Sequence, residues 1–132
     1  MIFAEKVKCE LLSLIDEMAT TPWLFVKHPE TDFSRIRKLD FASVCRMILA
    51  MESGGIQKEL LSYFKFSCDT PSASALSQQR AKFLPDAFEF LLHEFNSRFP
   101  NTKRYKGYRL LACDGSDLNI ARNPKDQDTY FQ

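Results

Sequence analysis

Apolar residues recur at intervals of three and four over much of the chain, which is the spacing of one face of an α-helix. In the first segment the apolar positions with this spacing are Phe3, Val7, Leu11, Leu14, Ile15 and Met18. Thr20, Thr21 and Pro22 are expected to end that helix. Residues 23–38 show no clean period and contain Pro29, so we expect irregular structure there, with room for one short helix.

Four further helices are predicted between residues 40 and 100. Asp40 has the character of an N-cap, because a helical pattern follows at once and stops at Gly54-Gly55. A third helix is predicted from Ile56 to about Phe66. The fourth is predicted over about 72–83, with Thr70 as its cap and Pro71 at its first helical position. The fifth restarts at Pro85 and has an apolar stripe formed by Phe88, Leu91, Leu92, Phe95 and Phe99.

The pattern changes after the basic loop NTKRYKG at residues 101–107. The apolar run 108–113 (YRLLAC) predicts a buried strand, and the turn dipeptide Asp114-Gly115 leads to a second short strand near 117–120. Two short strands are marginal alone in water, so the rest of their domain is expected to lie elsewhere. The predicted fold is mainly α, with a bundle of about five helices in residues 1–104 and the start of a sheet in residues 105–132.

The composition is that of an ordinary globular chain, with 45% hydrophobic and 27% charged residues among 132. A net charge of +1 means that any DNA affinity must come from a local basic patch. Twelve phenylalanines predict an aromatic core that also includes Trp23.

Three of the four cysteines lie in apolar stretches, which favours their interpretation as reduced residues of the core. No signal peptide and no membrane-spanning apolar run is visible, so we expect a cytoplasmic protein.

Asp114 is the residue whose position suggests chemistry. An apolar strand that ends in a carboxylate and a glycine turn suits metal-dependent phosphoryl transfer, because the strand fixes the oxygen ligands. The same pattern also describes an aspartate that only begins a tight turn. The residues alone leave both interpretations open.

Several blocks of the sequence resemble the insertion-sequence-four group of bacterial DDE transposases. The blocks are SASALSQQRAKFLPDAF (72–88), YKGYRLLACDGSDLNI (105–120) and NPKDQDTYF (123–131), with SRIRKLDF and MESGG upstream. The resemblance implies that residues 105–132 begin an RNase H-like catalytic domain that is incomplete in this chain. It also implies that Asp114 is the first of three carboxylates that bind Mg²⁺ for DNA cleavage and strand transfer. The second Asp and the Glu have no counterpart here, so the chain alone is not expected to catalyse a reaction.

The third and fourth predicted helices suggest a helix-turn-helix, although the turn between them is longer than usual. The fourth helix carries side chains that can bond base edges and phosphates, namely Ser74, Ser77, Gln78, Gln79, Arg80 and Lys82. Two basic clusters complete the candidate DNA-binding set, namely Arg35, Arg37 and Lys38, and Lys103, Arg104 and Lys106. Each of these groups also has a simpler interpretation as a solvated surface.

The leading hypothesis is the N-terminal part of a DDE transposase that binds the terminal inverted repeats of its element and is associated with the nucleoid. The alternative is a free-standing helical DNA-binding or interaction module with no catalytic role. A homo-oligomer is expected in either case, because the apolar strand 108–113 exposes edge groups that another copy can pair with. Neither a membrane nor a small-molecule substrate is expected.

Overall fold

The computed structural model of the chain describes residues 2–35, 37–99 and 104–109. The chain divides into two compact units, Met1–Pro100 and Asn101–Gln132. The predicted second strand at 117–120, residues 110–113 of the first, and the RNase H-like assignment lie outside the described residues.

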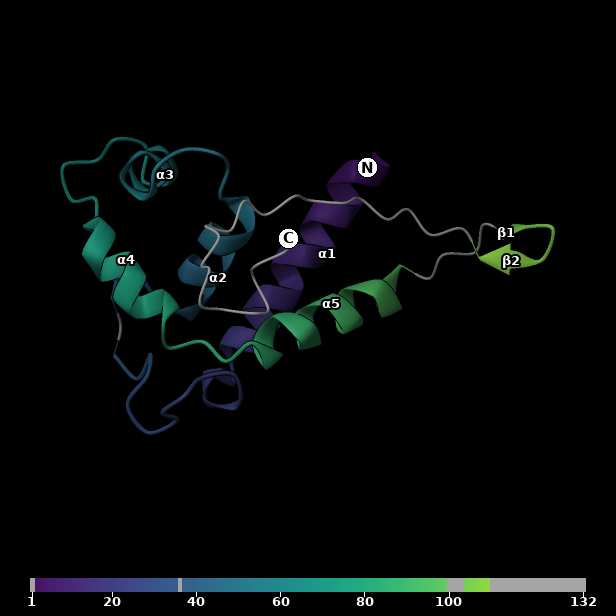
Figure 1. The fold of residues 1–132 in the computed structure, drawn as a ribbon, viewed down its shortest axis with the longest axis horizontal. Helices are drawn as coiled ribbons and strands as arrows, with labels where there is room; N and C mark the ends of the chain where they lie inside the picture. The colour runs from purple at the N-terminus through teal and green to yellow at the C-terminus, as the bar shows by residue number, and fades with distance from the viewer. Residues whose placement is uncertain (1, 36, 100–103, 110–132) are drawn as a thin grey trace, which may run out of the picture. The chain divides into compact units, whose positions relative to one another are not determined.

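The first unit is helical, as predicted (Figure 1). Its elements are α1 (Phe3–Ala19), the short 3-10 helix η1 (Pro22–Leu24), α2 (Phe41–Ala50), α3 (Ile56–Tyr63), α4 (Ala73–Arg80) and α5 (Asp86–Arg98). α1 packs against α2 and α5, and α2 packs against α3 and α4. None of the helices in the described part of the chain has the length and apolar character needed to span a membrane.

Side-chain caps fix the starts of two helices. The backbone N–H of Ser43 donates to the carboxylate of Asp40 at 2.7 Å, which confirms the predicted N-cap of α2. The predicted cap of α4 was wrong, because Ser72 and not Thr70 accepts the N–H of Ala75, at 3.2 Å. The Thr70 hydroxyl instead donates to the carbonyl of Ser67 at 2.6 Å and closes the preceding turn.

The predicted helix ends were too late for α2, α3 and α4, and α4 ends at Arg80 instead of near residue 83. α2 ends at Ala50, because Met51 already has extended backbone, so Gly54-Gly55 is not the stop signal. α3 ends at Tyr63 and not near Phe66, because Lys65 and Phe66 adopt φ of 53° and 58°. Their N–H groups donate to the carbonyls of Ser62 at 3.1 Å and Leu61 at 2.7 Å. This is the Schellman pattern, which satisfies the last carbonyls of a helix.

Phenylalanine rings fill the centre of the bundle around Phe41 and Phe83, whose centroids lie 4.7 Å apart. Phe33 packs edge-on against both rings, at 5.7 Å from Phe41 and 5.3 Å from Phe83. The backbone supports this cluster, since the N–H of Leu84 donates to the carbonyl of Phe25 at 2.9 Å. The irregular segment before α2 is thereby fastened to the connection between α4 and α5.

Several predicted core assignments were wrong, and among the phenylalanines Phe3, Phe66 and Phe90 are exposed. Trp23 is 51% exposed, and Leu92 is 58% exposed because the inward face of α5 runs through Ala87 and Leu91. Among the described cysteines only Cys45 is buried, whereas Cys9 and Cys68 are exposed. Cys9 lies in an apolar stretch of the sequence but on the outer face of α1. An apolar stretch therefore did not predict that a cysteine is buried.

The described part of the second unit is a hairpin of β1 (Arg104–Tyr105) and β2 (Tyr108–Arg109). The strands are antiparallel, with Arg104 opposite Arg109 and Tyr105 opposite Tyr108. Lys106 and Gly107 form the turn with φ of 48° and 84°. Two central residues at positive φ suit the right-handed twist of a two-residue hairpin. The predicted strand does begin at Tyr108, but residues 104–105 pair with it instead of belonging to a loop.

Candidate nucleic-acid interface

The polar helix predicted to meet DNA is α4, and one apolar residue anchors it. Leu76 is 2% exposed and faces the core. Ser74, Ser77, Gln78 and Arg80 are exposed. The side-chain amide of Gln78 donates to the hydroxyl of Ser74 at 3.2 Å, so two of these polar groups are already paired. The exposed face is available to a partner and is polar along its length.

The connection between α3 and α4 differs from that of a helix-turn-helix. Residues 64–72 join the two helices and contain the Schellman turn at Lys65-Phe66 and the turn closed by Thr70. A helix-turn-helix usually has a turn of three or four residues. α3 and α4 do pack together. α3 and α4 therefore place a polar helix on the surface, but the segment that joins them is not the short turn of a helix-turn-helix.

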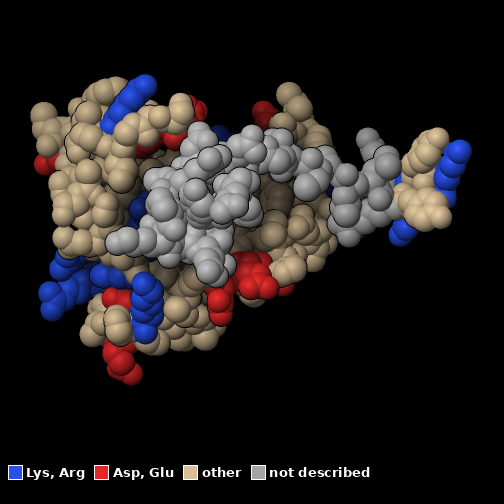
Figure 2. All heavy atoms as spheres, in the orientation of Figure 1, with Lys and Arg blue, Asp and Glu red and all other residues tan. Residues whose placement is uncertain are grey.

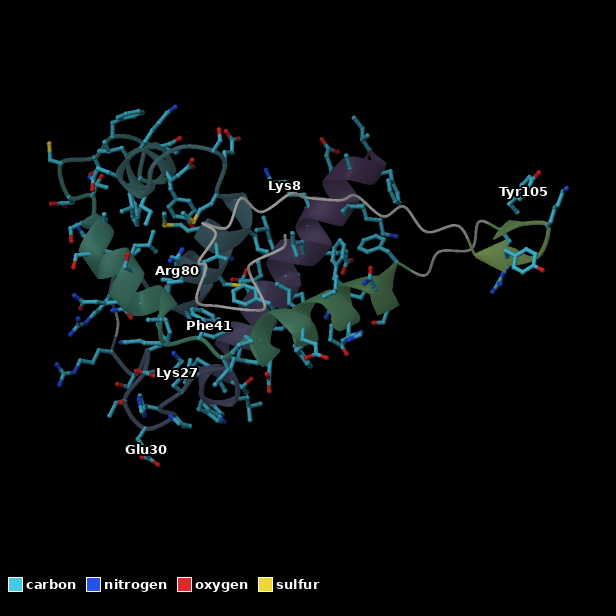
Figure 3. The ribbon with its side chains drawn as sticks, in the orientation of Figure 1. Lys8, Lys27, Glu30, Phe41, Arg80 and Tyr105 are labelled. Carbon is cyan, nitrogen blue, oxygen red and sulfur yellow. The ribbon has the colours of Figure 1, made fainter. Side chains whose placement is uncertain are left out.

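The structure brings Arg35 and Arg37, two members of the first basic cluster, to the C-terminal end of α4. Arg35 and Arg37, from the irregular segment, line a pocket of about 260 Å³ together with Gln79 and Lys82. Basic side chains gather on this side of the molecule in Figure 2, and Figure 3 labels Lys27 and Glu30 on the same segment. We call this the basic pocket. Its donors come from two stretches more than forty residues apart, and no sequence motif links those stretches.

Lys82 has a fixed place at the rim of the basic pocket. Its ammonium nitrogen lies 3.8 Å from Oδ1 of Asp32 and 5.3 Å from the centre of the Phe33 ring. Asp32 is only 7% exposed, and its other oxygen accepts the N–H of His28 at 3.0 Å. The carboxylate and the ring face together orient Lys82 while neutralising part of its charge.

Lys38 and Arg80 are not among the residues that line the basic pocket. Lys38 is turned to the loop before α4, where its Nζ lies 3.2 Å from Oδ2 of Asp69 and donates to the Asp69 carbonyl at 3.0 Å. This exposed contact holds the irregular segment against that loop. Arg80 is exposed on α4 itself.

Thr31 and Ser34 also line the basic pocket and were not predicted as site residues. The Thr31 hydroxyl is of the type that donates to phosphate oxygens, whereas the Ser34 hydroxyl already donates to the carbonyl of Thr31 at 2.9 Å. The signal in the sequence was their place in TDFSR beside Arg35, but nothing there indicated that the segment folds against α4.

The second basic cluster belongs to the hairpin of the second unit. Arg104 and Lys106 are exposed. Nη1 of Arg104 donates to the carbonyl of Gly107 at 3.4 Å, and Nζ of Lys106 lies 5.4 Å from the Tyr105 ring. Lys103 lies outside the described residues, and so does Asp114, the predicted catalytic and metal-binding residue.

Across the described ranges, no three His, Cys, Asp or Glu side chains come together in a way that would hold a metal ion. The one strongly shifted thiol in those ranges is explained by packing, since burial raises the pKa of Cys45 to about 11. A thiol of this kind is a core group and not a nucleophile.

No protein-family model matches the chain, and comparison with curated proteins and with solved structures gave no match either.

Proposed function

We propose that the chain is the N-terminal part of a DDE transposase and that its helical unit binds the DNA of the element ends. The support comes from the sequence resemblance at 72–88, 105–120 and 123–131, together with the basic pocket. The pocket is the observation that carries the proposal. Three cationic side chains, Arg35, Arg37 and Lys82, converge there beside the amide of Gln79.

The basic pocket has the chemistry of a phosphodiester site. Arginine guanidinium groups bind phosphate oxygens in a fork, and Thr31 adds a hydroxyl donor. Phosphate contacts of this kind position a protein on DNA, whereas base edges provide the sequence preference. In this proposal the exposed face of α4, with Ser74, Ser77 and Gln78, provides the base contacts.

The catalytic part of the proposal rests on the resemblance alone. Asp114 would be the first of three carboxylates that hold Mg²⁺, and the metal would supply the activated oxygen nucleophile for DNA cleavage and strand transfer. Only Asp114 has a counterpart in this sequence. No catalytic step is therefore assigned to the residues of this chain.

A DNA-binding titration of the whole chain at two salt concentrations tests the proposal. It compares the terminal inverted repeat of the parent element with a scrambled duplex. The double variant Arg35→Ala/Arg37→Ala should weaken binding to both duplexes and reduce the salt slope by about one for each phosphate that is no longer neutralised. The matched control is Lys6→Ala/Lys58→Ala, which removes two exposed cations from α1 and α3.

Preference for the repeat, together with weakening confined to the first double variant, would support the proposal. If both double variants weaken DNA binding equally, the binding depends only on the net charge of the chain and not on the basic pocket. Absence of binding to either duplex would overturn DNA recognition by this unit. It would favour the alternative, a helical interaction module, for which the exposed Leu49 and Tyr63 provide an apolar surface.

A further inference from the structure

An apolar groove of about 410 Å³ lies where α1, α2 and α3 meet, and it shares no lining residue with the basic pocket. We call it the α1–α2 groove. Leu11 and Leu12 form its α1 side, while Leu49 and Tyr63 come from α2 and α3. Leu49 is 46% exposed and Tyr63 is 37% exposed. Apolar side chains grouped in this way leave surface that a protein partner would cover.

Two opposite charges, Lys8 in the α1–α2 groove and Asp16 beside the groove residue Arg46, are equally spaced about Leu12 along α1. Lys8 lies four residues before Leu12 and Asp16 lies four residues after it, so all three share one helical face. At 1.5 Å rise per residue each charge is about 6 Å from Leu12 along the axis. Asp16 accepts from the guanidinium of Arg46, which lines the groove, and Lys8 lines it as well (labelled in Figure 3).

From this arrangement we infer that the occupant of the α1–α2 groove is a second copy of the chain, with the two α1 helices antiparallel across a two-fold axis near Leu12. In that arrangement Lys8 of each copy lies opposite Asp16 of the other. A two-fold contact uses the same patch on both copies, so the pairing forms twice. A parallel arrangement would instead place Lys8 against Lys8 and Asp16 against Asp16. Like charges would then oppose the contact.

The contact covers the apolar surface that Leu12, Leu49 and Tyr63 expose among the described residues. Leu12 meets its own counterpart at the axis, while Leu49 and Tyr63 of each copy contact α1 of the other. Asp16 then has two cations, Arg46 of its own chain and Lys8 of the second copy. This dimer requires neither DNA nor the hairpin, so it stands independently of the proposed function.

Charge reversal tests the pairing, with the molar mass of the whole chain measured by sedimentation equilibrium. Lys8→Asp alone and Asp16→Lys alone should each raise the dimer dissociation constant about tenfold or more, because both symmetric contacts become repulsive. An equimolar mixture of the two variants should restore the dimer as a heterodimer, since a pairing of opposite sign can form again. Lys6→Asp is the control, with the same change of charge on an exposed α1 residue that is not among those lining the groove.

Leu49→Lys gives a second test that does not depend on the charge pairs. It should abolish the dimer while the helical circular dichroism stays unchanged, because Leu49 is half exposed in the single chain. Leu92→Lys, at an exposed leucine of α5, should leave the dimer intact. A wild-type chain that stays monomeric at about millimolar concentration would overturn the inference. So would a dimer that survives both Leu49→Lys and Lys8→Asp, or a mixture that fails to re-associate although both variants are folded.

Discussion

The ammonium nitrogen of Lys82 lies 3.8 Å from a carboxylate oxygen of Asp32, the one charged residue that is buried within the described ranges. This contact joins the irregular segment to the end of α4 at the rim of the basic pocket. The carboxylate keeps Lys82 in place and also competes with any anion that enters. Asp32, which holds Lys82 in place, therefore also lowers the affinity of the basic pocket for phosphate.

Asp32→Asn is expected to strengthen DNA binding. The amide oxygen of Asn can still accept the N–H of His28, so the turn keeps its hydrogen bond, but the negative charge beside Lys82 is gone. We expect an affinity gain of about two- to tenfold at low salt that shrinks as salt is added. A DNA titration at two salt concentrations measures this gain. Unchanged affinity in a folded Asp32→Asn variant would mean that Lys82 does not meet DNA.

Asp69→Asn is the matched control for Asp32→Asn, because it removes a carboxylate of the same kind away from the basic pocket. Asp69 is exposed and pairs with Lys38, which does not line the pocket. The control should change the DNA affinity less than Asp32→Asn does. An equal gain in both variants would assign the effect to net charge.

Lys65→Gly is expected to stabilise the protein. Lys65 occupies the C′ position after α3 with φ of 53°, a conformation that costs an L-residue about 1 kcal/mol and costs glycine little. The free energy of unfolding from urea denaturation should rise by up to about 1 kcal/mol. Lys58→Gly, in the interior of α3, should lower it by a similar amount. A loss of stability in Lys65→Gly would contradict the assigned C-terminal turn.

The pair Glu17 and Arg98, which joins α1 to α5 at 2.5 Å, predicts a pH dependence. The hydrogen bond from Arg98 lowers the pKa of Glu17. A carboxyl whose pKa is lower in the folded state stabilises the protein above its unfolded pKa, and this contribution is lost as the pH falls through the folded pKa. Wild type should therefore melt at a higher temperature than Glu17→Gln at neutral pH, and the gap should narrow as the pH falls below the usual glutamate pKa of about 4.3 and close at more acidic pH. A gap that is constant across this range would contradict the pair.

Local signals in the sequence were enough to predict most of the helical unit. Asp40 precedes a strong helical pattern, and its cap is where it was expected. The end of α3 was missed, because a Lys-Phe pair at positive φ has no signal of the kind that glycine gives. Cys9 in α1 and Leu92 in α5 were predicted to be buried but are exposed, for a different reason. The helical period of the sequence determines which residues share a face, but packing against neighbouring elements determines how wide the buried face is.

The basic pocket could be predicted only in part. Arg35, Arg37 and Lys82 were recognised as donors from their charge, but their convergence depends on long-range contacts. The contact of Phe33 with Phe83 and the backbone hydrogen bond from the N–H of Lys27 to the carbonyl of Lys82 bring the two segments together. No periodicity within either segment encodes such a contact.

Cysteine reactivity tests the placement of the thiols. Cys45 is 1% exposed, and its pKa is raised to about 11 by burial, whereas Cys9 and Cys68 are exposed. Because the thiolate is the reacting form, the raised pKa alone lowers the reactive fraction of Cys45 about a hundredfold near neutral pH, and burial slows it further. In the native protein we expect an alkylating reagent to label Cys9 and Cys68 within minutes and Cys45 only after unfolding in urea. Mass spectrometry of the peptides separates the sites, and native labelling of Cys45 at the rate of Cys68 would show that α2 does not pack into the core as described.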